Sequence, residues 1–122
     1  MKKILIIEDE TLIALSLKKL LSKRGHQVTT IESGLEAIQL LRRESFDRVI
    51  CDLMLQDISG FDIIEESRTY IGEDKIKLDF VIMTAYNSSQ VLEKAREYGC
   101  EILSKPFEDL NLALSIIEGV KV

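Results

Sequence analysis

Residues 4–10 read Ile-Leu-Ile-Ile-Glu-Asp-Glu, a short apolar run followed at once by three acidic residues. Consecutive residues of a strand point to opposite faces, so an unbroken apolar run is typical of a strand that is covered on both faces. Four further short, largely apolar runs occur later in the chain, at residues 28–31, 49–53, 78–83 and 102–103. The chain therefore holds five candidate strands of the kind found in parallel sheets.

Five longer stretches, between and after these runs, space their apolar residues as helices do. Ser33 and Ser59 each stand three residues before an acid, Glu36 and Asp62, which is the spacing of the capping box that opens a helix. The helix after Ser33 is expected to turn Leu35 toward the core. The five expected helices start before Leu12, at Ser33, at Ser59, near Ser88 or Ser89, and after Pro106.

The alternation of these elements predicts the fold class. Strands separated by helices run parallel, because each helix returns the chain to the edge of the sheet at which the previous strand began. The order is therefore (βα)5, and the predicted architecture is an open, doubly wound α/β fold with a parallel five-stranded sheet. A chain of 122 residues has the length of one domain. We expect a single domain over residues 1–122, with no output domain.

Composition and charge narrow the function. Acidic residues outnumber basic ones by 21 to 16, the net charge is −5, and no run of Lys or Arg exceeds two residues, so direct nucleic-acid binding is not expected. The apolar runs are far shorter than the ~20 residues that span a bilayer, and they do not resemble a signal peptide. The chain is expected to be cytoplasmic, with Cys51 and Cys100 as reduced thiols.

Polar residues stand where four of the predicted strands end. Glu8 and Asp9 follow the first strand, and Asp52, Thr84 and Lys105 stand at the ends of the third, fourth and fifth. In open parallel sheets the ligand site lies beyond the carboxyl ends of the strands, so these side chains are expected to converge. They form the candidate functional site.

The charges of this candidate site predict a bound cation. Glu8, Asp9 and Asp52 carry −3 and Lys105 carries +1, and like charges at close range are unfavourable. Mg²⁺ takes one or two carboxylates together with phosphate oxygens and water, and a divalent cation makes the cluster about neutral. Mg²⁺ is therefore the expected cofactor.

Other kinds of site are not supported. The sequence has neither the GxxxxGK[ST] of a phosphate-binding loop nor the GxGxxG of a dinucleotide-binding fold. A haloacid-dehalogenase-type phosphatase needs a second Asp two residues after the nucleophile, where Met54 stands. His26, the single histidine, is expected on the surface and supports no catalytic triad. A stand-alone metal-dependent hydrolase would need a general acid, and the candidate site offers none.

What remains is a carboxylate nucleophile beside a metal, which suits acceptance of a phosphoryl group from an activated donor. Phosphoryl transfer requires positioning and charge neutralisation more than acid–base help. On this interpretation Asp52 is the acceptor, Lys105 holds one phosphoryl oxygen as a point charge, and Thr84 donates a hydrogen bond to another. An Asp carboxylate is ionised at pH 7 and needs no general base.

Four segments together resemble the receiver domain of two-component response regulators. They are residues 4–10, 52–60, 83–86 and 105–107, which read ILIIEDE, DLMLQDISG, MTAY and KPF. The resemblance covers essentially the whole chain and implies the flavodoxin-like receiver fold with strand order 2-1-3-4-5. It also implies a phosphoprotein that receives its phosphoryl group from a sensor histidine kinase or a histidine phosphotransfer protein. Such a protein is not otherwise an enzyme, and catalyses only its own phosphorylation and slow autodephosphorylation.

The resemblance assigns a role to each residue of the candidate site. Asp52 matches the phosphoryl acceptor, Thr84 the switch hydroxyl and Lys105 the lysine of the phosphoryl pocket. The peptide bond before Pro106 is implied to be cis. The implied metal ligands are Glu8, Asp9, Asp52 and the backbone carbonyl of Met54.

The resemblance also implies how the signal leaves the domain. The output face is formed by the fourth helix, the fifth strand and the fifth helix, and it binds a downstream protein or a second copy of the chain. Met54 and Tyr86 occupy the positions that tune autodephosphorylation in this family. The alternative is a degenerate receiver, which acts as a phosphorylation-independent interaction module.

The sequence departs from the family pattern at two consequential positions. Ile102 stands where the family usually has Tyr or Phe, after a shorter stretch from Gly99, which would weaken or reroute the usual switching motion. Gln56 replaces a usual Pro, so a looser loop is expected before the third helix. Asp57 is expected to be a loop acid near the start of that helix.

Overall fold

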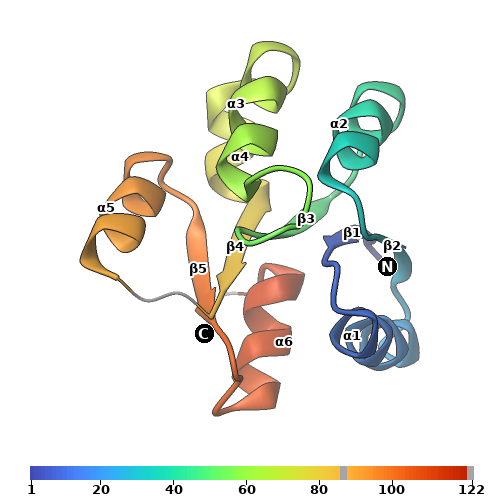
Figure 1. Ribbon diagram of the computed structural model, residues 1–122. Helices are drawn as coiled ribbons and strands as arrows, with labels where there is room; N and C mark the ends of the chain where they lie inside the picture. The colour runs from blue at the N-terminus through green and yellow to red at the C-terminus, as the bar shows by residue number, and fades with distance from the viewer. Residues whose placement is uncertain (86–87, 121–122) are drawn as a thin grey trace.

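A computed structural model describes residues 1–85 and 88–120, and these ranges contain the five predicted strands (Figure 1). The strands are β1 (Lys3–Ile7), β2 (Gln27–Ile31), β3 (Arg48–Asp52), β4 (Phe80–Thr84) and β5 (Glu101–Ser104). The helices in the same ranges are α1 (Thr11–Lys23), α2 (Gly34–Arg43), α3 (Gly60–Ile71), α4 (Glu73–Asp79), α5 (Ser89–Glu97) and α6 (Leu110–Glu118). Tyr86, predicted to tune autodephosphorylation, lies outside the described residues.

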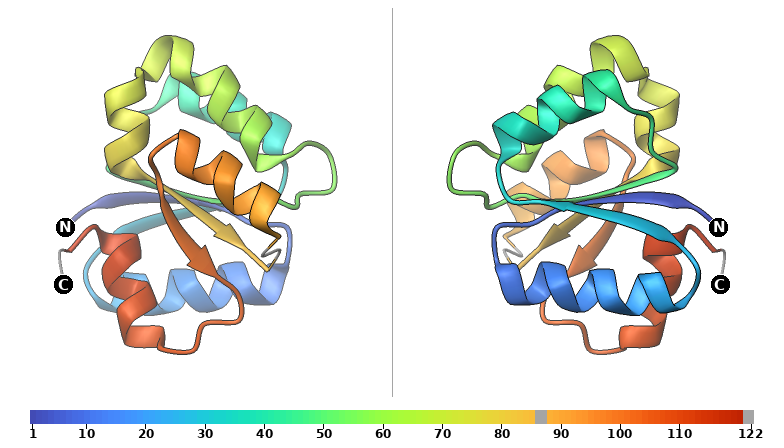
Figure 2. Two further views of the ribbon diagram at one scale, coloured as in Figure 1. Left: turned by 90° about the vertical axis from the view of Figure 1, so that its left-hand side faces the viewer. Right: turned by 90° about the vertical axis from the view of Figure 1, so that its right-hand side faces the viewer.

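The strands form a parallel sheet in the order β2-β1-β3-β4-β5, which confirms the predicted doubly wound topology. The sheet lies between two helical layers: α1 and α6 cover one face, and α2, α3, α4 and α5 cover the other (Figure 2). Strand residues alternate between the two apolar cores, with Ile6 and Ile50 toward α1 and α6, and Ile7 and Cys51 toward the other layer. Cys51 and Cys100 are buried free thiols, as expected.

The segment before β4 differs from the prediction. The sequence predicts a strand over residues 78–83, but the first two of these residues belong to α4, and β4 begins at Phe80. Leu78 is 70% exposed, so its apolar side chain does not mark a buried strand. Lys75 Nζ contacts Asp79 Oδ2 at 2.6 Å one helical turn later, which favours the helix. The predicted fourth and fifth helices are therefore α5 and α6.

In the described part of the chain, none of the helices is long and apolar enough to cross a bilayer.

The starts of α2 and α3 follow the predicted capping signals. Ser59 and Asp62 form a reciprocal capping box at α3. At α2, Ser33 Oγ accepts a hydrogen bond from the backbone N–H of Glu36 at 3.2 Å. Leu35 is exposed, contrary to the prediction, because it lies outside the face of α2 that packs on the core. The buried residues of α2 are Gly34, Ala37, Ile38 and Leu41.

The amino ends of the strands hold a buried arginine that no local sequence pattern marks. Arg48, the first residue of β3, donates hydrogen bonds to the carbonyl oxygens of Leu78, Ile116 and Ile117 at 2.6, 2.9 and 2.9 Å. These carbonyl groups belong to the last turns of α4 and α6, where carbonyl groups have no partner four residues later in the helix, although Ile116 also accepts the Gly119 N–H. Arg48 therefore ties two helix ends to the central strand, in the position where a cation is favoured.

His26 is largely buried, contrary to the surface position predicted for it. Its Nδ1 accepts the backbone N–H of Lys2 at 3.1 Å, and its Nε2 lies 2.6 Å from a carboxylate oxygen of Glu118. Arg24 contacts the other oxygen of Glu118 at 2.6 Å. These contacts join the start of β1 and the loop before β2 to the end of α6, at the edge of the sheet opposite the candidate site. The histidine therefore has a structural role.

Candidate functional site

Parallel pairing brings the carboxyl ends of the strands to one edge of the sheet. Glu8 follows β1 directly, and Asp52 and Thr84 are the last residues of β3 and β4. The register of β3, β4 and β5 keeps their ends level. The backbone N–H of Lys105 donates to the Thr84 carbonyl oxygen at 2.8 Å, which holds the segment after β5 against β4. The bond between Lys105 and Pro106 is cis, as predicted.

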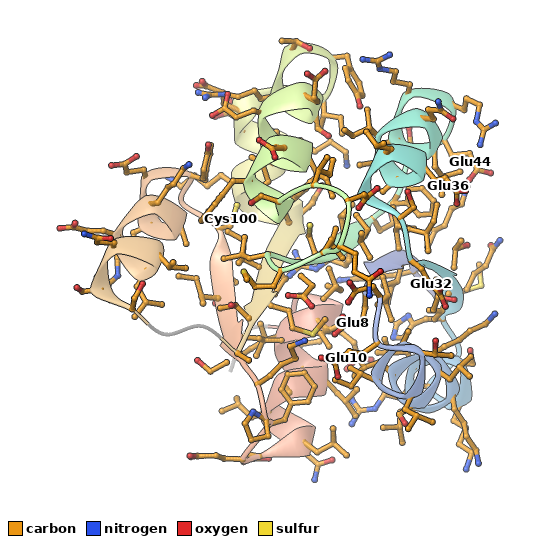
Figure 3. The ribbon with its side chains drawn as sticks, in the orientation of Figure 1. Glu8, Glu10, Glu32, Glu36, Glu44 and Cys100 are labelled. Atoms are coloured by element: carbon orange, nitrogen blue, oxygen red, sulfur yellow. The ribbon has the colours of Figure 1, made fainter. Side chains whose placement is uncertain are left out.

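The Lys105 ammonium lies between the acids at the ends of β1 and β3. Its Nζ is 2.7 Å from Glu8 Oε1, 3.0 Å from Asp52 Oδ2 and 3.9 Å from Glu10 Oε1. The side chains of Glu8, Asp52 and Lys105 expose 0%, 4% and 8% of their surface, so little water shields these charges from one another. Figure 3 shows Glu8 and Glu10 next to each other after the end of β1. One lysine thus forms ion pairs with two buried carboxylates.

Asp9 adds a third carboxylate to this group. One oxygen from each of Glu8, Asp9 and Asp52 lies within 4.8 Å of the others. Carboxylate oxygens are the ligands that a hard cation such as Mg²⁺ prefers. Lys105 supplies one positive charge for three carboxylates, so the excess negative charge fits a divalent cation. The predicted metal-binding side chains are therefore brought together, while the backbone carbonyl of Met54 stays a prediction.

The surroundings of this site shift the pKa values of Glu8 and Lys105. Burial raises the pKa of Glu8 to about 7, because a carboxylate away from water disfavours its charged form. The neighbouring Asp52 also raises the pKa of Glu8, and the hydrogen bond from Lys105 lowers it in part. Burial lowers the pKa of Lys105, but its hydrogen bonds to Glu8 and Asp52 outweigh burial and raise the net pKa. Additional positive charge at this point would favour the ionised form of Glu8.

The loop between β3 and α3, residues 53–59, fixes the second oxygen of the Asp52 carboxylate. The backbone N–H of Met54 donates to Asp52 Oδ1 at 3.1 Å. The N–H of Gly60 donates to the Leu53 carbonyl oxygen at 3.1 Å and closes the loop at its base. The side chain of Met54 is exposed. Both oxygens of Asp52 thus have a donor, since the other oxygen accepts from the lysine.

The residues predicted to take part in the switching motion, Thr84 and Ile102, lie at the end of β4 and in β5. Thr84 is fully buried. Ile102 is half-buried and packs, with Tyr98, against the core on the side of α2, α3, α4 and α5. The Tyr98 ring stacks on Phe61 of α3, with ring centroids 5.8 Å apart. An aromatic contact between α3 and the end of α5 is therefore present, although residue 102 is aliphatic.

Asp57 is a loop acid near the start of α3, as predicted, and it also contacts the start of α2. Its Oδ2 accepts from the Leu35 N–H at 3.0 Å and from Ser33 Oγ at 2.8 Å, and its Oδ1 accepts from the Gly34 N–H at 3.0 Å. The bond from Leu35, supported by the others, lowers the pKa of Asp57 well below its ordinary value. No local sequence signal marks these contacts, because the partners are 22 to 24 residues away.

Known proteins match this chain along nearly its whole length. A family model described as the response regulator receiver domain matches residues 4–117. Sporulation initiation phosphotransferase F of Bacillus subtilis is 29% identical over 108 residues, which cover 88% of this chain and 84% of that protein. The crystal structure of response regulator protein TrrA of Thermotoga maritima, in complex with Mg²⁺-BeF, matches with a TM-score of 0.78 at 28% identity. That match covers 98% of this chain and 100% of the TrrA chain.

Some relatives are much longer. Transcriptional regulatory protein ZraR of Klebsiella oxytoca is 31% identical over 115 residues, which cover 92% of this chain and 25% of that protein. The chain therefore spans about a quarter of the length of ZraR, and most of the length of phosphotransferase F.

Proposed function

This chain belongs to the response regulator receiver domain family, and we propose that it is a phosphorylation-activated signalling switch whose phosphoryl acceptor is Asp52. The observation that carries the proposal is the setting of Asp52 at the end of β3. Lys105 Nζ lies 3.0 Å from one of its oxygens, and the Met54 N–H donates to the other at 3.1 Å. The carboxylates of Glu8 and Asp9 lie beside it. A nucleophile, a counter-charge and candidate metal ligands thus share one small site.

In the proposed reaction Asp52 is the nucleophile. One carboxylate oxygen forms a bond to the phosphorus of a phosphohistidine while the phosphorus–nitrogen bond breaks, and the bonding electron pair leaves with the imidazole nitrogen. No general base is needed, because a carboxylate attacks without losing a proton. Lys105, already at hydrogen-bond distance from Asp52, then binds a phosphoryl oxygen as a charged donor. The Thr84 hydroxyl, from the end of β4, is the proposed donor to another phosphoryl oxygen.

Mg²⁺ is the proposed cofactor. When bound, it neutralises negative charge on the phosphoryl oxygens. Glu8 must be ionised to bind the metal, and since its pKa is raised to about 7, binding of Mg²⁺ would favour release of its proton. The complex of the related TrrA protein with Mg²⁺-BeF supports this choice of metal. The proposed ligands are the carboxylates of Glu8, Asp9 and Asp52 and the backbone carbonyl of Met54.

The proposed donor is a sensor histidine kinase or a histidine phosphotransfer protein. Phosphorylation would shift the conformation of the output face, which in this structure is formed by α5, β5 and α6, so that a downstream protein or a second copy binds there. Met54 and Tyr86 are proposed to tune autodephosphorylation, and Ile102 to limit the switching motion. On this proposal the chain works in the cytoplasm and catalyses only its own phosphorylation and slow dephosphorylation.

The intact mass of the protein after incubation with acetyl phosphate tests the proposal. We expect wild type to gain one phosphoryl group with Mg²⁺ and none with EDTA. Asp52→Asn is expected to gain none, whereas Asp74→Asn, which changes an exposed aspartate in the first turn of α4, should behave as wild type. No gain in wild type that binds Mg²⁺, with acetyl phosphate or with a phosphorylated phosphotransfer protein, would favour the degenerate receiver.

A further inference from the structure

Asp57 joins the loop after the phosphoryl acceptor to the first turn of α2. Its carboxylate accepts hydrogen bonds from the N–H groups of Gly34, Leu35 and Ile58, each at 3.0 Å, and from Ser33 Oγ at 2.8 Å. The N–H groups of Gly34 and Leu35 open α2 and have no partner within the helix. A carboxylate is also favoured at the positive end of a helix dipole. The contact between loop and helix is therefore charge-assisted.

Apolar packing joins the same loop to α2 independently. A β-carbon on Gly34 would lie 2.5 Å from Ile58 Cγ1 and 3.2 Å from Leu55 Cδ1. The absence of a side chain at Gly34 thus lets two loop side chains reach the start of the helix. Leu55 and Ile58 are partly buried against the core on this side of the sheet. The position of the loop is therefore determined by α2 as well as by β3.

This loop also carries the main chain that contacts the phosphoryl acceptor. The Met54 N–H donates to Asp52 Oδ1 at 3.1 Å, and Met54 pairs with Ser59 in an antiparallel bridge at the base of the loop. The loop projects beyond the end of the sheet (Figure 2), so few other elements restrain its tip. Gln56 lacks the ring that restrains a proline backbone. The bonds of Asp57 supply a restraint next to that position.

We propose that Asp57 is a positioning residue for the phosphoryl site: by holding residues 53–59 on α2, it fixes the main chain of Met54 beside Asp52. The inference rests on the proposed function, because it gives Asp57 a part in metal binding and phosphoryl transfer at that site. Within the described residues, the hydrogen bonds of Asp57 join it to α2 and to its own loop, so its effect on Asp52 passes through Met54.

The Mg²⁺ dissociation constant of the unphosphorylated protein tests this inference. We expect Asp57→Ala to weaken Mg²⁺ binding about tenfold, as loss of a group that orients a ligand does. It should also speed hydrogen exchange of the Met54 amide. Asp57→Asn keeps one carboxamide oxygen as an acceptor. Its Mg²⁺ dissociation constant should lie between those of Asp57→Ala and wild type. The matched control, Asp74→Ala, removes an exposed aspartate from the first turn of α4 and should bind Mg²⁺ as wild type does.

A double variant separates positioning of the loop from capping of the helix. Gln56→Pro in the Asp57→Ala background restricts the loop but restores no acceptor for α2. We expect it to regain part of the Mg²⁺ affinity, while the Gly34 and Leu35 amides continue to exchange fast. No recovery would contradict the loop as the link between Asp57 and Asp52.

A helix cap without a positioning role gives a different result. Asp57→Ala would then speed amide exchange at Gly34 and Leu35, yet match Asp74→Ala in Mg²⁺ affinity and in the rate of phosphorylation by acetyl phosphate. That outcome overturns the inference. A wild-type protein that accepts no phosphoryl group overturns the proposed function instead, since the effect of Asp57→Ala on Mg²⁺ affinity and Met54 exchange is measured without phosphorylation.

Discussion

A β-carbon on Gly60 would lie 2.5 Å from the carbonyl oxygen of Asp52. The first residue of α3 therefore packs directly on the main chain of the proposed phosphoryl acceptor. Glycine is needed at this position for its lack of a side chain, since its φ is not in the left-handed region.

We predict that Gly60→Ala lowers the free energy of unfolding by about 2 kcal/mol, because the two main chains must move apart. Urea denaturation measures the loss. Asn111→Ala, on the exposed surface of α6, is the control and should change the free energy by less than about 0.5 kcal/mol. Equal values for the two variants would show that the close approach at Asp52 relaxes without cost.

The buried position of Glu8 predicts how stability depends on pH when metal is absent. Its pKa is raised from 4.5 to about 7 in the folded protein, so the stability that protonated Glu8 contributes is present below pH 4.5 and is lost as the pH rises through about 7. In EDTA, we expect the free energy of unfolding to fall by about 2 kcal/mol more in wild type than in Glu8→Gln between pH 5 and pH 8. Urea denaturation at both pH values checks this. Parallel curves for the two proteins would contradict it.

Arg48 lies far from the site, and its replacement is expected to destabilise the fold. Arg48→Met removes a donor from three carbonyl oxygens at the ends of α4 and α6, of which Ile116 keeps the Gly119 N–H, so we expect the free energy of unfolding to fall by about 3 kcal/mol. Thermal or urea denaturation measures the change. Arg42→Met removes an exposed pair with Glu66 and should cost less than about 1 kcal/mol. Similar losses in the two variants would contradict a structural role for the buried guanidinium.

Ser67 is a position at which a substitution is expected to stabilise the protein. It is buried in α3, and its hydroxyl has no hydrogen-bond partner among the described residues. Ser67→Ala should raise the free energy of unfolding by about 1 kcal/mol, because burial of an unpaired hydroxyl is unfavourable. Ser22→Ala, on the exposed side of α1, measures the part of this gain that comes from helix propensity. A gain no larger than that of Ser22→Ala would mean that the hydroxyl is satisfied in solution.

Most of the fold was predictable because three strands are buried on both faces. β1, β3 and β4 therefore read as apolar runs, and the stretches between the strands show helical spacing and Ser caps. The prediction started β4 two residues early because Leu78 is apolar, and a local pattern does not reveal that this side chain is exposed. Leu35 was misplaced for the same reason: the face of α2 that is buried depends on what packs against it.

The candidate site was predictable because topology alone brings the carboxyl ends of parallel strands together. Glu8, Asp52 and Lys105 each stand at such an end, and their contacts follow from that position. The roles of His26, Arg48 and Asp57 were not predictable. Each contacts partners between 22 and 92 residues away, so its environment depends on how helices and loops pack rather than on neighbouring sequence.

The most direct test of the central claim is to locate the phosphoryl group after wild type has reacted with acetyl phosphate and Mg²⁺. Borohydride reduces an aspartyl phosphate to homoserine, so peptide mapping identifies the aspartate that carried the group. We predict homoserine at position 52 alone, and only when Mg²⁺ is present. Homoserine at position 9 or 57, or its absence from position 52 in the Mg²⁺-bound protein, would contradict Asp52 as the phosphoryl acceptor.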